Sequence, residues 1–156
     1  ALQQVIAEHK FEAIMLGIRR DEEGTRAKER IFSPRNLAFE WDFRDQPPEL
    51  WDQFQTSCPP GAHLRVHPIL NWTEMDVWEY VEREKIPVID LYFAKNGKRY
   101  RSLGCEPCTE PIESNAATVP EIVAELKATK KAEREGRAQD LADTHAMQKL
   151  RAKGYM

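Results

Sequence analysis

The sequence predicts an α/β fold built around a parallel sheet. A helical pattern over residues 1–9 is followed by a short apolar run, residues 11–16, which ends at Gly17. A helix that leads into a short apolar strand is typical of an αβ step in a parallel sheet. A further short strand is expected at residues 63–66. The length of 156 residues suits a single domain.

Prolines, caps and aromatic residues predict the elements in the middle of the chain. Residues 33–62 contain repeated prolines together with several aromatic side chains, which indicates a packed loop. Thr73 and Asp76 form a pattern like a capping box, which begins a helix, and Pro87 marks its end. The apolar face of that helix is formed by Met75, Trp78 and Val81.

The last part of the chain becomes steadily more polar. Residues 88–94 are an apolar run, and an Asn-Gly turn then leads into a basic stretch. Thr118 and Glu121 predict a second capping box. From Lys127 onward most residues are polar, and a last helical pattern ends near Gly154. We therefore predict an α/β domain over residues 1–127 and a polar helical tail over residues 128–156.

Composition excludes several classes of function. The net charge of −3 argues against a nucleic-acid-binding protein. No apolar run approaches the ~20 residues that span a bilayer, so no membrane partner is expected. Three cysteines are too few for a disulfide framework and suit a reducing cytosol. The chain begins at Ala1, which indicates either processing or a piece of a longer protein.

Two basic segments are candidates for an anion site. Residues 19–30 hold five bases and four acids, so the segment is either a salt-bridged helical face or a site at a strand end. Arg19 and Arg20 directly follow the strand and its glycine, and the guanidinium fork matches oxyanion oxygens in pairs. Residues 95–101 hold four bases and no acid, and form either an anion clamp or a solubilising hairpin tip.

Cysteine and histidine residues offer weaker signals. Cys105 and Cys108 have the spacing of two metal or cluster ligands, yet such sites usually need four, and only Cys58 remains. We therefore predict no metal site in this chain alone. A redox dithiol and a pair of inert thiols remain the alternatives. His67 is interpreted as a structural histidine beside a strand.

Three motifs, in this order, resemble the adenosine-nucleotide alpha-hydrolase superfamily in its branch of phosphoadenylyl-sulfate reductases and sulfate adenylyltransferase small subunits. They are Gly-Ile-Arg-Arg-Asp-Glu-Glu at residues 17–23, Pro-Ile-Leu-Asn-Trp-Thr-Glu-Met-Asp-Val-Trp at residues 68–78, and Leu-Gly-Cys-Glu-Pro-Cys-Thr at residues 103–109. Residues 26–33 and residues 132–155 resemble the adenylyltransferase small subunits more than the reductases. The family's Ser-Gly-Gly-Lys-Asp-Ser-type loop, which binds pyrophosphate, does not occur in these 156 residues.

The resemblance implies the C-terminal portion of a parallel-sheet domain of the adenosine-nucleotide alpha-hydrolase type. It implies a cytoplasmic enzyme that takes ATP, with Mg²⁺, and sulfate, forms adenylyl sulfate and pyrophosphate, and works with a GTPase large subunit. Arg19, Arg20 and Arg26 would contact sulfate or phosphate oxygens, and Arg99 and Arg101 would close over them. Because the pyrophosphate loop is missing, we expect this chain alone to be inactive.

Two alternatives stay open at this stage. One is a reductase that releases sulfite from an adenylyl sulfate and holds an iron–sulfur cluster, in which Cys105 and Cys108 would be completed by further cysteines. The other is a non-catalytic module that binds an anion or docks a partner.

Overall fold

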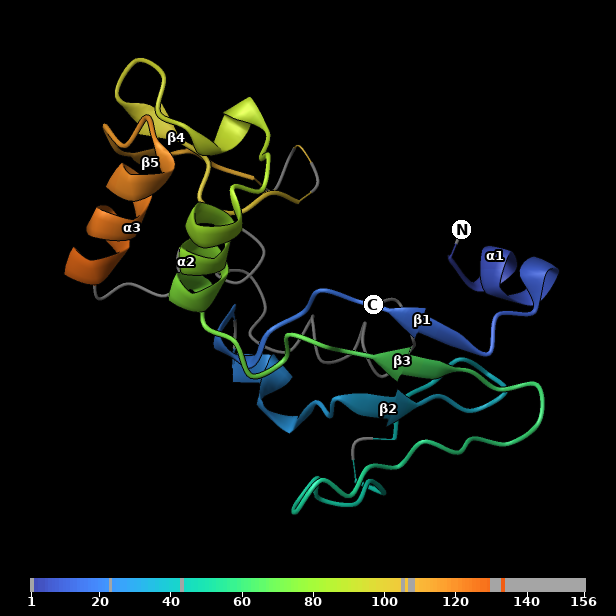
Figure 1. Cartoon of the computed structure of the whole chain (residues 1–156). Coiled ribbons are helices and arrows are strands. Elements are labelled where there is room, and N and C mark those ends of the chain that lie inside the picture. The colour runs from blue at the N-terminus through green and yellow to red at the C-terminus, as the bar shows by residue number, and fades with distance from the viewer. Residues whose placement is uncertain are drawn as a thin grey trace. The chain divides into compact units, whose positions relative to one another are not determined.

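The structure, a computed structural model, describes residues 2–22, 24–42, 44–104, 106, 109–129 and 133. The chain divides into two compact units (Figure 1). Among the described residues, the first unit comprises residues 2–20 and 24–71, and the second comprises residues 21, 22 and 72–129 with residue 133. The division between residues 127 and 128 stays a prediction, because most of the polar tail lies outside the described residues.

A three-stranded sheet with the order β1-β3-β2 forms the scaffold of the first unit (Figure 1). Helix α1 (Leu2–His9) leads into β1 (Ala13–Met15), which confirms the expected αβ step. Strand β1 pairs in parallel with β3 (Leu64–Val66), and β2 (Phe32–Pro34) pairs with β3 in the antiparallel direction. The expected parallel sheet is thus present as one strand pair, and the described sheet is mixed.

Strand β2 corrects the interpretation of residues 33–62 as loop throughout. The Glu49 carboxylate accepts the backbone N–H groups of Ile31 and Phe32 at 2.7 and 2.8 Å, which fixes the start of the strand. This partner is too distant along the chain for local patterns to find. The packed-loop expectation holds for Trp41, which is buried beneath the Arg35 guanidinium at 5.4 Å from the ring centre.

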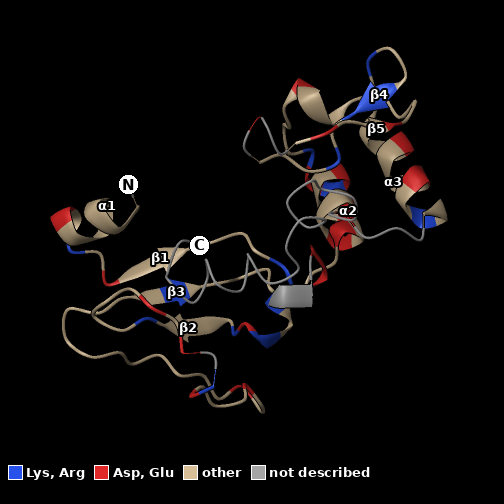
Figure 2. Cartoon of the chain, turned by 180° about the vertical axis from the view of Figure 1, so that it is seen from behind, with Lys and Arg blue, Asp and Glu red and all other residues tan. Residues whose placement is uncertain are grey.

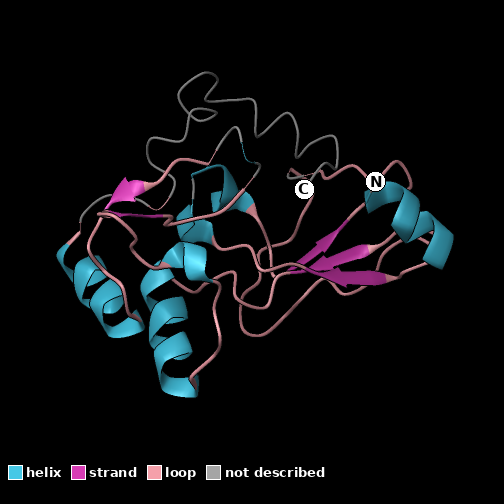
Figure 3. Ribbon diagram, turned by 90° about the horizontal axis from the view of Figure 1, so that it is seen from above, coloured by secondary structure: helices cyan, strands magenta, loops and turns pink. Residues whose placement is uncertain are grey.

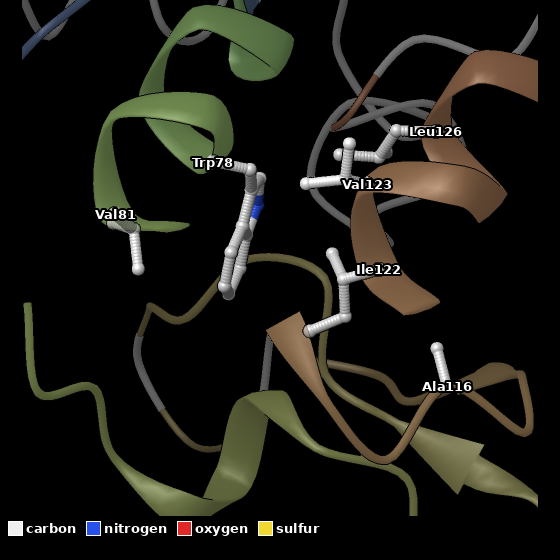
Figure 4. Packing of buried hydrophobic residues seen from close by; sticks show 6 residues of the cluster. All are labelled: Trp78, Val81, Ala116, Ile122, Val123 and Leu126. Atoms are coloured by element: carbon white, nitrogen blue, oxygen red, sulfur yellow. The ribbon is translucent and has the colours of Figure 1, made fainter. Parts of the chain in front are cut away.

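Two helices pack side by side in the second unit (Figure 3). They are α2 (Glu74–Glu84) and α3 (Val119–Ala128), and short strands β4 (Lys98–Arg99) and β5 (Ile112–Glu113) form an antiparallel pair. The rings of Trp78 and Tyr92 meet edge to face, with centroids 5.6 Å apart. The apolar cluster that holds the helices together consists of Trp78, Val81, Ala116, Ile122, Val123 and Leu126 (Figure 4).

The helix caps test the two predicted capping boxes. At α2 the Thr73 hydroxyl accepts the Asp76 N–H at 3.1 Å, and the Asp76 carboxylate accepts the Thr73 N–H at 2.7 Å, so this box is confirmed. At α3 the Thr118 side chain makes no cap hydrogen bond. The Glu121 carboxylate instead accepts the N–H of Ala117 at 2.8 Å. The second capping box is therefore incomplete: Glu121 accepts hydrogen bonds from Ala117 and Thr118, but the Thr118 hydroxyl does not cap the helix.

Short 3₁₀ turns connect these elements. They are η1 (Arg20–Glu22), η2 (Gly24–Lys28) and η3 (Asp90–Tyr92), the last lying within the apolar run at residues 88–94. Within the described ranges, no helix is long and apolar enough to cross a membrane.

Candidate anion-binding site

The loops that follow the two parallel strands meet at the carboxyl ends of those strands. The Leu16 N–H donates to the carbonyl of Val66 at 2.9 Å, and the Arg20 N–H donates to the carbonyl of Leu70 at 2.9 Å. Ligands of open α/β sheets bind beyond this end. The structure therefore brings residues 17–20 and residues 68–71, which belong to two of the three motifs, to the expected place.

Arg20 ties the two loops together through its side chain. Its Nη1 group donates to the side-chain carbonyl oxygen of Asn71, and its Nη2 group donates to the backbone carbonyl of Glu29 at 2.9 Å. These bonds engage two of the five N–H donors of the guanidinium. The side chain is half-buried, so it is held in place and keeps donors for the oxygens of a ligand.

Arg20 lines a cavity of about 410 Å³. Arg30 lies on the same wall and is held by hydrogen bonds from Nε to the carbonyl of Pro47 at 3.0 Å and from Nη1 to that of Lys28 at 3.3 Å. Two carboxylates, Glu49 and Asp52, also line the cavity, and Glu49 is already engaged by backbone N–H groups. The full lining is Arg20, Arg30, Ile31, Pro48, Glu49, Leu50, Trp51, Asp52, Phe54 and Asn71.

Arg19 and Arg26 belong to the same unit but lie in its interior, only 8% and 5% exposed. They do not line the cavity. The adjacent arginines Arg19 and Arg20 thus diverge, with Arg20 toward the cavity. Gly17 has no left-handed backbone angle, and a Cβ atom placed there would meet Ile69 at 3.9 Å, an ordinary contact. The loop therefore does not require glycine for its conformation.

Arg99 and Arg101 lie in the second unit, where each is paired with a carboxylate. Arg99 donates to Glu125 Oε1 from Nη2 at 2.7 Å and from Nε at 3.2 Å. Arg101 makes a bidentate pair with Glu74, with Nε–Oε1 at 3.0 Å and Nη2–Oε2 at 2.6 Å. The Arg101–Glu74 pair is nearly buried, whereas in the other pair Arg99 is fully buried and Glu125 is 30% exposed.

The other two bases of residues 95–101 also have acidic partners. Lys95 lies 3.4 Å from Asp90, and Lys98 lies 3.3 Å from Glu113 on the neighbouring strand. Figure 2 shows β4 entirely in the colour of Lys and Arg. The segment looked uncompensated only because its acids lie elsewhere in the sequence. A role of Arg99 and Arg101 in holding substrate stays a prediction.

A buried polar cluster in the first unit was not predicted. It has one carboxylate, Glu29, which accepts the Ser33 hydroxyl at 2.7 Å and lies 3.7 Å from the Arg35 guanidinium. The other members are His63, Arg65 and His67, all at most 2% exposed. These three residues occupy every second position along the segment that contains β3, with Arg65 within the strand and the two histidines flanking it. Polar residues at every second position, from 63 to 67, were the signal that could have revealed a polar strand face.

Both histidines of this cluster have lowered pKa values. Burial and the neighbouring guanidiniums of Arg65 and Arg35 lower the pKa of His63 from 6.5 to about 4. Burial also lowers the pKa of His67, although its hydrogen bond to the Arg30 carbonyl opposes the shift. His67 Nδ1 lies 2.7 Å from that carbonyl, so Nδ1 carries the proton. His67 thereby positions the segment whose Arg30 and Ile31 line the cavity, in agreement with its structural interpretation.

The cysteine prediction falls partly outside the structure. Cys105 and Cys108 are not among the described residues, and Cys58 is half-buried and forms no disulfide. The described ranges contain no group of three or more His, Cys, Asp or Glu that could hold a metal ion.

Comparison with known proteins defines the class of this chain. Residues 1–111 match the family described as the phosphoadenosine phosphosulfate reductase domain, and the chain belongs to that family. It is also similar to proteins named sulfate adenylyltransferase subunit 2. The relative from Trichlorobacter lovleyi is 43% identical, with 99% of this chain and 61% of the relative covered. The relative from Rhodopseudomonas palustris is 41% identical, with 99% and 56% covered.

These comparisons confirm the resemblance found in the motifs and also set its extent. The chain spans only 56–61% of the length of these two relatives. The alignment with the first covers 183 positions, more than the 156 residues of this chain. That relative therefore has residues within the matched region that this chain lacks.

Proposed function

We propose that this chain is part of a sulfate adenylyltransferase subunit, which joins sulfate to the α-phosphate of ATP. The observation that carries the proposal is the similarity, along 99% of the chain, to proteins named sulfate adenylyltransferase subunit 2. The cavity beside Arg20 supports it, because guanidinium donors lie beyond the carboxyl ends of a parallel strand pair. The fold proposed for the whole enzyme domain is a parallel sheet of the adenosine-nucleotide alpha-hydrolase type.

The reaction is a displacement at phosphorus. A sulfate oxygen attacks the α-phosphorus of ATP, and the bond from that phosphorus to the oxygen bridging to the β-phosphate breaks. Pyrophosphate leaves with the electron pair, and adenylyl sulfate remains. In such reactions the protein mainly positions the reactants and stabilises oxygen charge. Mg²⁺ is proposed as a companion of the nucleotide, carried on its phosphates.

Arg20 is the proposed contact to sulfate or phosphate oxygens in the cavity. Arg19 and Arg26 are proposed from the family motif. Because both side chains are buried in the same unit, they would contact only the part of a ligand that faces the interior of the unit. Arg99 and Arg101 would have to exchange Glu125 and Glu74 for substrate oxygens. Such an exchange is balanced in charge, because one anion replaces another, but it needs a movement of the side chains.

The proposed partner is a GTPase large subunit. The name shared by the relatives, subunit 2, indicates an enzyme of more than one subunit. Coupling to GTP hydrolysis would drive the unfavourable formation of adenylyl sulfate. A cytoplasmic location is proposed with this assignment, and no nucleic-acid or membrane partner is proposed.

A reductase remains the second candidate, because the family description names a reductase domain and because Cys105 and Cys108 have ligand spacing. It would cleave sulfite from an adenylyl sulfate with electrons from a thiol donor. An iron–sulfur cluster would need cysteines beyond the three in this chain.

The deciding experiment measures two products from the enzyme that contains this chain. With a GTPase large subunit, ATP and sulfate, we expect pyrophosphate release that depends on sulfate. With adenylyl sulfate and thioredoxin as thiol donor, we expect no sulfite. Sulfite without pyrophosphate supports the reductase, and neither product supports a non-catalytic module. The 156-residue chain alone is expected to release no pyrophosphate, because its sequence contains no pyrophosphate-binding loop.

A further inference from the structure

Trp51 is an unusual residue on the wall of the Arg20 cavity. Its side chain is 87% exposed, the largest exposed fraction among the large apolar side chains of the described residues. Tryptophan normally buries a large apolar surface or finds a partner for it. The other described tryptophans do so: Trp41 and Trp78 are buried, and Trp72 is half-buried.

The backbone at Trp51 has an unusual conformation. Trp51 and Asp52 have positive φ angles of 50° and 58°, so two consecutive residues other than glycine occupy the left-handed region. Such a conformation costs free energy and persists only where the surroundings enforce it. The turn is closed by the Gln53 N–H, which donates to the Leu50 carbonyl at 3.0 Å. Strain of this kind at a cavity wall motivates a functional hypothesis.

The same cavity presents two different kinds of surface. Arg20 and Arg30 offer N–H donors to an anion, and Trp51 offers an aromatic face. A molecule that uses both has an oxyanion at one end and a flat aromatic group at the other. The volume of about 410 Å³ lies in the range of small-molecule sites. A nucleotide carrying an acid anhydride has both groups.

We propose that Trp51 is the stacking platform for the adenine base of adenylyl sulfate, while Arg20 holds the anionic end. This inference rests on the proposed function and adds the residue that distinguishes a nucleotide from a simple oxyanion. Stacking on an aromatic side chain recognises the π-face of a base, whereas guanidinium donors recognise only charge and oxygen geometry. Trp51 is therefore a specificity-determining residue and takes no part in the chemical step.

The test compares two ligands on the enzyme that contains this chain. Adenylyl sulfate and inorganic sulfate are titrated calorimetrically into the parent enzyme and into Trp51→Ala, Trp51→Phe and Leu37→Ala. Leu37→Ala is the matched control, because Leu37 is 66% exposed in the same unit and does not line this cavity. Trp51→Phe keeps an aromatic face.

We expect Trp51→Ala to weaken adenylyl sulfate binding roughly 5- to 150-fold, which corresponds to the ~1–3 kcal/mol of one stacked base. Sulfate binding should stay within about twofold of the parent value, since no base is involved, and Trp51→Phe should restore most of the loss. The control should bind both ligands like the parent.

Two outcomes overturn the inference and leave the proposed function standing. In the first, Trp51→Ala binds adenylyl sulfate like the parent. In the second, it loses both ligands equally, which indicates a role in holding the cavity together. If the parent enzyme does not bind adenylyl sulfate, the proposed function fails and this inference fails with it.

Discussion

Acidification should destabilise this chain through His63, whose ring is buried and feels the charges of the Arg65 and Arg35 guanidinium groups. Its pKa is about 4 in the folded chain and 6.5 as the ordinary value. Because the folded value is lower, the unfolded state binds the proton first as the pH falls. The stabilisation is fully present above pH ~6.5 and is lost as the pH falls toward ~4.

The size of the effect follows from the shift in pKa. Each pKa unit corresponds to ~1.4 kcal/mol, so the full loss is about 3 kcal/mol. Between pH 7.5 and pH 5.0 the expected loss is about 2 kcal/mol, because the folded ring is still mostly neutral at the lower pH. That window lies above the pH at which most carboxylates titrate. His67, whose pKa is also lowered, adds a loss of the same sign.

Urea denaturation of the 156-residue chain at these two pH values measures the effect. His63→Gln removes the titrating ring, so its free energy of unfolding should depend less on pH by about 2 kcal/mol over the window. His9→Gln, at an exposed position on α1, is the matched control and should follow the parent chain. If His63→Gln and the parent lose the same free energy, the account of the buried cationic cluster is incorrect.

Two further predictions concern the second unit, and both are measured as the free energy of unfolding in urea. Thr73→Ala should lose about 0.5–2 kcal/mol, because it removes a capping box, whereas Thr118→Ala should lose less, because this side chain makes no cap bond. Equal losses in the two variants would contradict the observed caps. Arg101→Ala should lose about 3–5 kcal/mol, because it removes the guanidinium partner of the nearly buried Glu74 carboxylate, whereas Lys98→Ala breaks an exposed pair and should lose at most about 1 kcal/mol. A smaller loss for Arg101→Ala than for Lys98→Ala would refute the pairing.

Local patterns predicted the features that local chemistry determines. The capping box at Thr73 depends on two side chains three residues apart, and it was confirmed. The apolar face of α2 follows helical spacing, and its Trp78 and Val81 are buried in the core of the second unit. The placement of Arg20 beyond a strand end followed from the apolar run that precedes it.

The features that were missed depend on contacts between distant residues. Strand β2 has only three residues and ends in a proline, and Glu49 fixes its start from a distant position in the sequence. Residues 95–101 looked like an uncompensated cationic clamp, yet their carboxylate partners come from other elements. The buried cluster around Arg65 was missed because its residues are polar, and polar residues in a sequence usually indicate an exposed segment. The fold nevertheless buries them.

The role of Arg20 is the central claim, and calorimetric titration of the enzyme that contains this chain tests it most directly. Arg20→Ala should weaken both sulfate and adenylyl sulfate by roughly 10- to 150-fold, the equivalent of one charge-assisted hydrogen bond of ~1.5–3 kcal/mol. Arg20→Lys should restore little, because lysine lacks the planar fork. Arg83→Ala, at a position 69% exposed on α2, should bind like the parent enzyme. If Arg20→Ala binds both ligands within twofold of the parent, the cavity beside Arg20 is not the anion site.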